Sequence, residues 1–272
     1  MMLKQRLYSS FFLWGILLAC LLIFKSFAVY LFIFVLTLSA ISELAKLFKI
    51  EKKIQYFNFY FASLFLLGYV INSHYFYLSQ ESFYTATFAF LFNWIVFCGK
   101  TIRALGFSLF CFWYIPLNLH FLFRLNELFQ NQITFISVTI WFVLVTKLTD
   151  VGGFFVGCAY GRHRLAPLVS PKKSWEGVGG GISFALAGGL LFQLLFSSYL
   201  PEGFTLSRNV LFVLILAWGS VISDLLESLI KRGLNTKDSG NTFPGIGGIL
   251  DLIDSLLLNI PLAYVLFKNF VL

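Results

Sequence analysis

The chain has 272 residues, 59% of them hydrophobic, and a mean hydropathy of +0.85. Soluble globular domains are about 45–50% apolar, so this composition excludes an ordinary soluble fold and predicts a polytopic membrane protein. The formal net charge is +8. Because the basic residues stand in short clusters between apolar segments, membrane topology explains them better than nucleic-acid binding, and no nucleic-acid partner is expected.

The apolar segments predict an all-α fold with about nine transmembrane helices. Each segment is roughly 16 to 20 residues long, which suits a hydrocarbon core of about 30 Å. The first looks like a signal sequence, but it lacks a small-x-small cleavage site and a second apolar run follows directly, so we expect it to remain as a span. The spans are expected at about 11–24, 27–45, 54–71, 83–98, 104–123, from 133 to before 162, 178–200, 209–230 and 249–267.

The distribution of lysine and arginine predicts a cytoplasmic N-terminus. With this orientation most basic residues fall in cytoplasmic loops, as the positive-inside rule requires, and the C-terminus faces outward. Two polar segments, 161–177 and 231–248, then lie on the cytoplasmic face, where nucleotides are found. We expect a single membrane domain over 1–272, with N-terminal transmembrane helices in 1–130 and a catalytic half in 131–272.

Charged residues crowd into the stretch from Ser223 to Ser255, between two apolar runs. Asp224 and Glu227 are three residues apart, a spacing that places both carboxylates on one face of a helix. Asp251 and Asp254 repeat that spacing at the start of the last span. Carboxylates on neighbouring helix ends suit one or two Mg²⁺ ions, which bind a few carboxylates together with substrate phosphates and water.

Positive charge and glycine lie between the two acidic pairs. Lys231, Arg232 and Lys237 provide cations for phosphate groups, and the run P-G-I-G-G at 244–248 leaves backbone amides accessible near a helix start. A simpler reading is that these are solvated helix-end charges which close a span under the positive-inside rule. That reading explains Lys231 and Arg232, but it does not explain four carboxylates at a membrane edge, which are costly there unless paired or bound.

A second group of polar and small residues extends from Asp150 to Gly181. Ser174 is placed to cap the helix that opens the seventh span, and Lys172 and Lys173 precede it, free to reach a polyanion. These two lysines are equally explained as topology determinants. The glycines of this segment have the small-xxx-small spacing that permits close helix packing; they are Gly157, Gly161, Gly177 and Gly181.

The motifs in these two stretches resemble those of a known family. The pattern S-x-x-K-R-x-x-x-x-K-D-S-G-x-x-x-P-G-x-G-G-x-x-D-x-x-D-S, from Ser228, is similar to the signature of the phosphatidate cytidylyltransferases, or CDP-diacylglycerol synthases. The segments S-P-K-K-S-W-E-G and D-V-G-G-F-F-V-G, the latter from Asp150, look like further motifs of that family. Across the first half of the chain only hydropathy supports the resemblance.

The resemblance implies a magnesium-dependent membrane enzyme that converts CTP and phosphatidate into CDP-diacylglycerol and pyrophosphate during phospholipid synthesis. It implies a homodimer in a bacterial inner membrane, surrounded by lipid, with the active site on the cytoplasmic face. The residues expected to carry the reaction and the metal are Asp224, Glu227, Asp251 and Asp254, with Lys231 and Arg232 as further catalytic residues. The residues expected to bind phosphates are Lys172, Lys173, Ser228, Lys237, Asp238, Gly247 and Gly248.

Two positions depart from the family pattern. Ile246 stands where the family usually has histidine, and Leu252 stands where it usually has arginine. Loss of a charge-assisted phosphate contact commonly costs about 1.5–3 kcal/mol unless another cation replaces it. Lys147 is also unexpected inside a span, and it is placed one turn before Asp150, with which it can pair.

Three alternatives to the cytidylyl transfer stay open at this level. A CTP-dependent lipid kinase would transfer the terminal phosphate instead. A degenerate family member would have lost activity through the changes at 246 and 252. A small-solute transporter would carry its ionisable residues near the bilayer midplane on broken helices of repeated halves, whereas here most lie at span ends and no repeat is visible.

Overall fold

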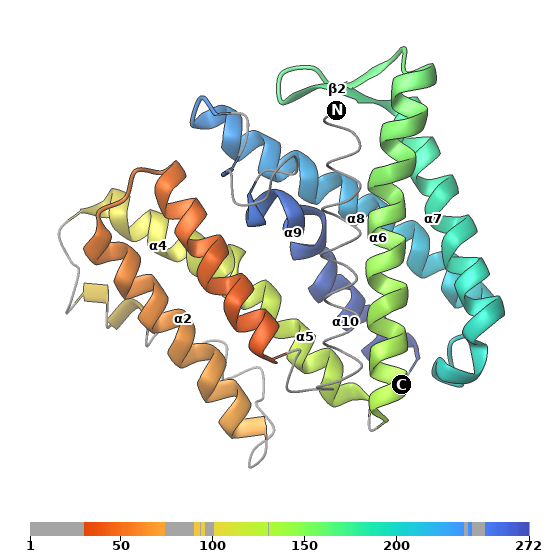
Figure 1. Cartoon of the computed structure of the whole chain (residues 1–272), viewed down its shortest axis with the longest axis horizontal. Helices are drawn as coiled ribbons and strands as arrows, with labels where there is room; N and C mark the ends of the chain where they lie inside the picture. The colour runs from red at the N-terminus through yellow and green to blue at the C-terminus, as the bar shows by residue number, and fades with distance from the viewer. Residues whose placement is uncertain are drawn as a thin grey trace. The chain divides into compact units, whose positions relative to one another are not determined.

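The computed structural model describes residues 30–73, 90–92, 94–95, 101–129, 131–236, 239–240 and 248–271. These residues are mostly helical (Figure 1). In chain order the elements are a helix Tyr30–Leu47, α2 (Lys52–Ser73), α4 (Ile102–Tyr114), α5 (Pro116–Leu128), α6 (Gln132–Tyr160), β1 (Arg164–Ala166), β2 (Ser170–Ser174), α7 (Trp175–Phe196), the 3₁₀ helix η1 (Ser197–Tyr199), α8 (Leu206–Gly233), α9 (Ile249–Leu257) and α10 (Asn259–Phe270).

Six helical segments of the described chain are long and apolar enough to cross a membrane. They are Tyr30–Leu47, Ile102–Leu128, Gln132–Tyr160, Trp175–Tyr199, Leu206–Gly233 and Ile249–Phe270. They coincide with the second and the fifth to ninth predicted spans, so the prediction of an all-α integral membrane protein is confirmed. The third predicted span is helical as α2 but is not among the six, and the first and most of the fourth lie outside the described residues.

Two of the predicted spans each contain a short break between two helices. The segment over 104–123 is interrupted at Ile115, where Pro116 begins α5 and provides no backbone N–H to continue α4. The segment over 249–267 is interrupted at Leu258. Pro261 lies in the first turn of α10, the part of a helix that tolerates proline.

The two polar segments also differ in detail from simple loops. The segment 161–177 contains an antiparallel hairpin in which Arg164 pairs with Ser174 and Ala166 with Ser170. Helix α8 continues to Gly233, so the basic residues after the eighth predicted span stand on its last turn. Ser174 caps α7 as predicted, because its side chain accepts a hydrogen bond from the backbone N–H of Gly177 at 3.1 Å.

The chain divides into two compact units, one of residues 1–123 with 239–250 and one of residues 124–238 with 251–272. An aromatic core fills the first unit; its buried members are Phe57, Phe61, Phe90, Trp94 and Phe112. In the second unit the rings of Trp141, Phe204, Phe212 and Phe267 pack edge-to-face or stacked on one another. Each unit therefore has its own apolar core.

Glycines bring α6 and α7 into close contact within the second unit (Figure 1). A Cβ atom on Gly177 would lie 2.9 Å from the carbonyl oxygen of Gly153 and 3.3 Å from Cα of Gly157. One on Gly181 would lie 2.7 Å from the carbonyl oxygen of Thr149. The small residues thus allow the two backbones to approach closely, as their spacing predicted.

Candidate active site

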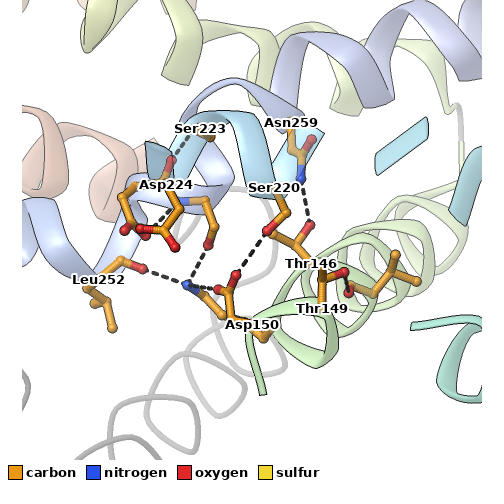
Figure 2. Close-up of polar contacts among 12 residues, drawn as sticks. Thr146, Thr149, Asp150, Ser220, Ser223, Asp224, Leu252 and Asn259 are labelled. Atoms are coloured by element: carbon orange, nitrogen blue, oxygen red, sulfur yellow. Dashed lines mark hydrogen bonds and ion pairs between the residues drawn. The ribbon is translucent and has the colours of Figure 1, made fainter. Parts of the chain in front are cut away.

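Three carboxylates gather in the second unit, where α8 and α9 meet. Asp224 and Glu227 on α8 and Asp254 on α9 each place one oxygen within 4.8 Å of the others. Glu227 is completely buried. The backbone carbonyl of Asp254 accepts a hydrogen bond from Ser223 Oγ, which ties α9 to α8 beside the cluster (Figure 2). We call Asp224, Glu227 and Asp254 the carboxylate triad.

Asp251, the fourth expected carboxylate, reaches this group through a lysine. Lys231 Nζ lies 2.7 Å from Glu227 Oε2 and 2.8 Å from Asp251 Oδ1. Glu227 and Lys231 are neighbours on one helix face, as their four-residue spacing predicted. The ammonium group therefore compensates part of the negative charge of the triad and links it to Asp251.

The hairpin brings a second lysine to the triad. Lys173 on β2 forms an ion pair with Asp224 on α8, with Nζ and Oδ2 2.5 Å apart, and its Nζ also donates to the backbone carbonyl of Val221 at 3.5 Å. Because Ser174 follows directly and caps α7, the strand end and the helix start fix the position of this lysine. The upstream motif and the acidic stretch thus meet at Asp224.

A pocket of about 250 Å³ adjoins the triad. Its walls come from α6, β2, α7 and α8, and Asp224 belongs to both the pocket and the triad. Lys172 and Lys173 line it together with glycines of the close α6–α7 contact; the glycines are Gly153, Gly157, Gly177 and Gly181. Such a pocket offers two lysines and a carboxylate to a phosphorylated ligand.

Asp150 lines this pocket as well, although it was expected only as the first residue of a motif. One of its oxygens accepts a hydrogen bond from Ser220 Oγ at 3.0 Å, and the other lies 3.4 Å from Lys147 Nζ, so the predicted pairing of Lys147 with Asp150 is confirmed (Figure 2). Lys147 Nζ also donates to the backbone carbonyl of Leu252 at 2.9 Å. The ammonium group of Lys147 therefore lies beside Leu252.

The remaining predicted site residues are less central or lie outside the described chain. Arg232 Nε and Nη1 donate to the backbone carbonyls of Val169, in the hairpin turn, and of Thr236, each at 3.4 Å. Ser228 is half-buried on α8, and Gly248 directly precedes α9. Lys237, Asp238, Ile246 and Gly247 lie outside the described residues.

The first unit contains a buried acid that sequence reasoning missed. Glu43 lies on the helix Tyr30–Leu47, and its two carboxylate oxygens accept hydrogen bonds from the backbone N–H groups of Ile249 and Leu250, each at 2.9 Å. A Cβ atom on Gly248 would overlap with this carboxylate. An acid in an otherwise apolar span was the available signal, because such residues are costly unless they bind something.

Fold and site together define a class, namely a polytopic membrane protein with a carboxylate triad that could hold a metal ion beside a pocket lined by lysines. The chain belongs to the cytidylyltransferase family, whose sequence profile matches residues 4–270. It is 38% identical over 173 residues to the phosphatidate cytidylyltransferase of Bacillus subtilis and 36% identical over 193 residues to that of Chlamydia trachomatis. These alignments cover 62% and 64% of this chain and 61% of each relative.

A shorter alignment has a higher identity. The phosphatidate cytidylyltransferase of Haemophilus influenzae is 44% identical over 124 residues, which cover 44% of this chain and 41% of that protein. These alignments cover between 41% and 61% of the length of the relatives, whereas the family profile extends over nearly all of this chain.

Proposed function

We propose that this protein transfers the cytidylyl group of CTP to phosphatidate and releases pyrophosphate, giving CDP-diacylglycerol. The observation that carries the proposal is the ion pair of Lys173 with Asp224, because it joins a lysine-lined pocket to a triad of carboxylates. The names of the relatives in Bacillus and Chlamydia, phosphatidate cytidylyltransferase, support it.

The pocket is the proposed site of the CTP phosphates. Lys172 and Lys173 supply positive charge on its β2 wall, which suits the oxygens of a polyphosphate. Phe154 lines the same pocket and is 55% exposed. We propose that the apolar surface around Phe154 receives the acyl chains of phosphatidate from the bilayer, while its phosphate reaches the triad.

The triad is the proposed magnesium site. Glu227 Oε1 is buried and has no hydrogen-bond partner among the residues that the structure describes, although the other oxygen of this carboxylate is bonded to Lys231. A buried oxygen without a partner is costly, and a hard cation held by Asp224, Glu227 and Asp254 would satisfy it. When bound, Mg²⁺ would neutralise phosphate charge and orient the phosphate oxygens.

The transfer needs positioning and charge compensation more than proton transfer. A phosphate oxygen of phosphatidate forms the new bond to the α-phosphorus of CTP, and the bond from that phosphorus to the β-phosphate bridging oxygen breaks, so that pyrophosphate leaves with the electron pair. The attacking oxygen is already anionic and requires no general base. Lys172 and Lys173 stabilise the charge on the departing phosphates, and Lys231 holds Glu227 of the triad in place.

We also propose nine spans with a cytoplasmic N-terminus, which place the site on the cytoplasmic face of a bacterial inner membrane, where CTP is available. The basic loops support this orientation. A homodimer is expected from the family resemblance alone.

The deciding experiment uses the purified, detergent-solubilised protein with phosphatidate, Mg²⁺ and CTP labelled either at the α- or at the γ-phosphate. The B. subtilis relative serves as the matched active control. Lipid that carries the α-label supports the proposal. Lipid that carries only the γ-label would identify a lipid kinase, and unlabelled lipid beside an active control would indicate a degenerate enzyme or a transporter.

A further inference from the structure

Lys147 is a charged residue within an apolar helix. It lies on α6, in the candidate span Gln132–Tyr160, and its side chain is only 24% exposed. A lysine in a membrane span is costly unless its charge is paired. The groups that surround its ammonium therefore indicate what the residue does.

The ammonium group donates to three acceptors. Lys147 Nζ lies 2.8 Å from Ser255 Oγ, 2.9 Å from the backbone oxygen of Leu252 and 3.4 Å from Asp150 Oδ2. A lysine ammonium has three N–H donors, so this arrangement uses all of them on protein groups. The geometry suits a residue that holds other residues in place, not one that binds substrate.

Two of these acceptors lead directly to the proposed site. Ser255 is buried, and its backbone N–H donates to Asp254 Oδ1 at 2.5 Å. Ser255 therefore links the ammonium group of Lys147 to the Asp254 carboxylate of the triad. Asp150 lines the pocket, and its other oxygen accepts from Ser220 Oγ on α8 (Figure 2). Lys147 thus connects α6 and α9, and through Asp150 it connects both to α8.

We propose that Lys147 is a positioning residue that fixes α9 against α6 and thereby orients Asp254 in the triad and Asp150 in the pocket wall. Leu252 accepts through its backbone carbonyl, so Lys147 on α6 brings a positive charge to this position of α9. The expected change in kcat rests on the proposed cytidylyl transfer, whereas the expected change in hydrogen exchange of α9 does not.

The test compares three variants with the wild-type protein in detergent. Lys147→Met removes the charge but keeps the length of the side chain, Lys147→Arg keeps the charge, and Ser255→Ala removes one acceptor. Lys268→Met is the matched control, because Lys268 is an exposed lysine on α10 that belongs to neither the pocket nor the triad. Hydrogen exchange of peptides from α9 and α7 is measured first, followed by kcat and KM for CTP.

We expect Lys147→Met to accelerate exchange in α9 by about tenfold while exchange in α7 stays unchanged, because only α9 loses its anchor. The kcat should fall by about 30- to 100-fold with KM for CTP within about threefold, since the lysine has no donor left for substrate. Lys147→Arg should recover part of both losses, Ser255→Ala should show a smaller loss, and Lys268→Met should behave as wild type.

Unchanged exchange in α9 of Lys147→Met would overturn the inference, whatever the activity. Equal acceleration in α7 and α9 would also overturn it, because Lys147 would then support general stability. If Lys147→Met does not fold, hydrogen exchange in α9 and α7 of Ser255→Ala is compared instead, and unchanged exchange in its α9 would overturn the inference. A wild-type protein without transfer activity would remove the proposed function and leave the exchange measurement decisive for Lys147.

Discussion

Lys173 and Asp224 form an ion pair between strand β2 and helix α8, with 2.5 Å between Nζ and Oδ2. These residues are far apart in sequence and belong to two different motifs. Their contact places one wall of the pocket directly beside the carboxylate triad. A substitution in this ion pair therefore tests the pocket and the triad together.

Lys173→Met should lower kcat/KM for CTP by about 10- to 100-fold, because a charge-assisted contact to a phosphate contributes about 1.5–3 kcal/mol. Lys172→Met is the comparison, since Lys172 lines the same pocket without an ion pair to Asp224 among the described contacts. It should have a smaller effect. Steady-state assays with labelled CTP measure both variants, and equal losses would contradict a special role of Lys173.

Asp254→Asn should reduce transfer by more than about 1000-fold and weaken Mn²⁺ binding, because it removes a proposed metal ligand. Asp251→Asn should reduce transfer and Mn²⁺ binding less, since Asp251 contacts the triad through Lys231. Exposed Glu202 provides the control substitution Glu202→Gln. Electron paramagnetic resonance with Mn²⁺ follows binding independently of activity. Wild-type Mn²⁺ affinity in Asp254→Asn would exclude it as a ligand.

Lys231→Met should destabilise the protein by about 3–5 kcal/mol, because it leaves the buried carboxylate of Glu227 without its cation. The double variant Glu227→Gln with Lys231→Met should recover part of that stability, because the buried charge of Glu227 is then absent while Asp251 still lacks its cation, and it should stay inactive. Thermal unfolding in detergent measures the first effect and the transfer assay the second. A double variant as unstable as the single one would argue against the buried pair.

Gly181→Ala should destabilise the α6–α7 contact by about 1–3 kcal/mol, because its Cβ would lie 2.7 Å from the carbonyl oxygen of Thr149. Gly179 stands on the same helix with no atom within 4 Å of its Cβ position. Gly179→Ala should therefore be neutral or stabilise by up to about 1 kcal/mol. Thermal unfolding compares the two, and a similar loss in both would contradict the close packing.

Glu43→Ala should lower the free energy of unfolding by about 1–3 kcal/mol for each buried N–H group that loses its acceptor. These are the backbone N–H groups of Ile249 and Leu250. Glu43→Gln keeps one carbonyl acceptor and should cost less. Exposed Glu51 gives the control substitution Glu51→Gln. Unfolding in detergent is the measurement, and a fully stable Glu43→Ala protein would show that these hydrogen bonds contribute little.

The sequence by itself determined the class of protein and the residues around which its site is built. Hydropathy predicts membrane helices because each must be apolar over a length set by the bilayer. The three- and four-residue spacings placed Asp224, Glu227 and Lys231 on one helix face, and the cap at Ser174 followed from its own neighbours. All of these are local rules, which act within a few residues of chain.

Only the tertiary structure decided which groups meet across helices. It joined Asp254 to the triad and turned Asp251 toward Lys231. It also placed Lys147 beside Leu252 and brought Glu43 to the start of α9. No spacing encodes such contacts, because they depend on how helices distant in sequence pack and on where a buried charge finds its partner.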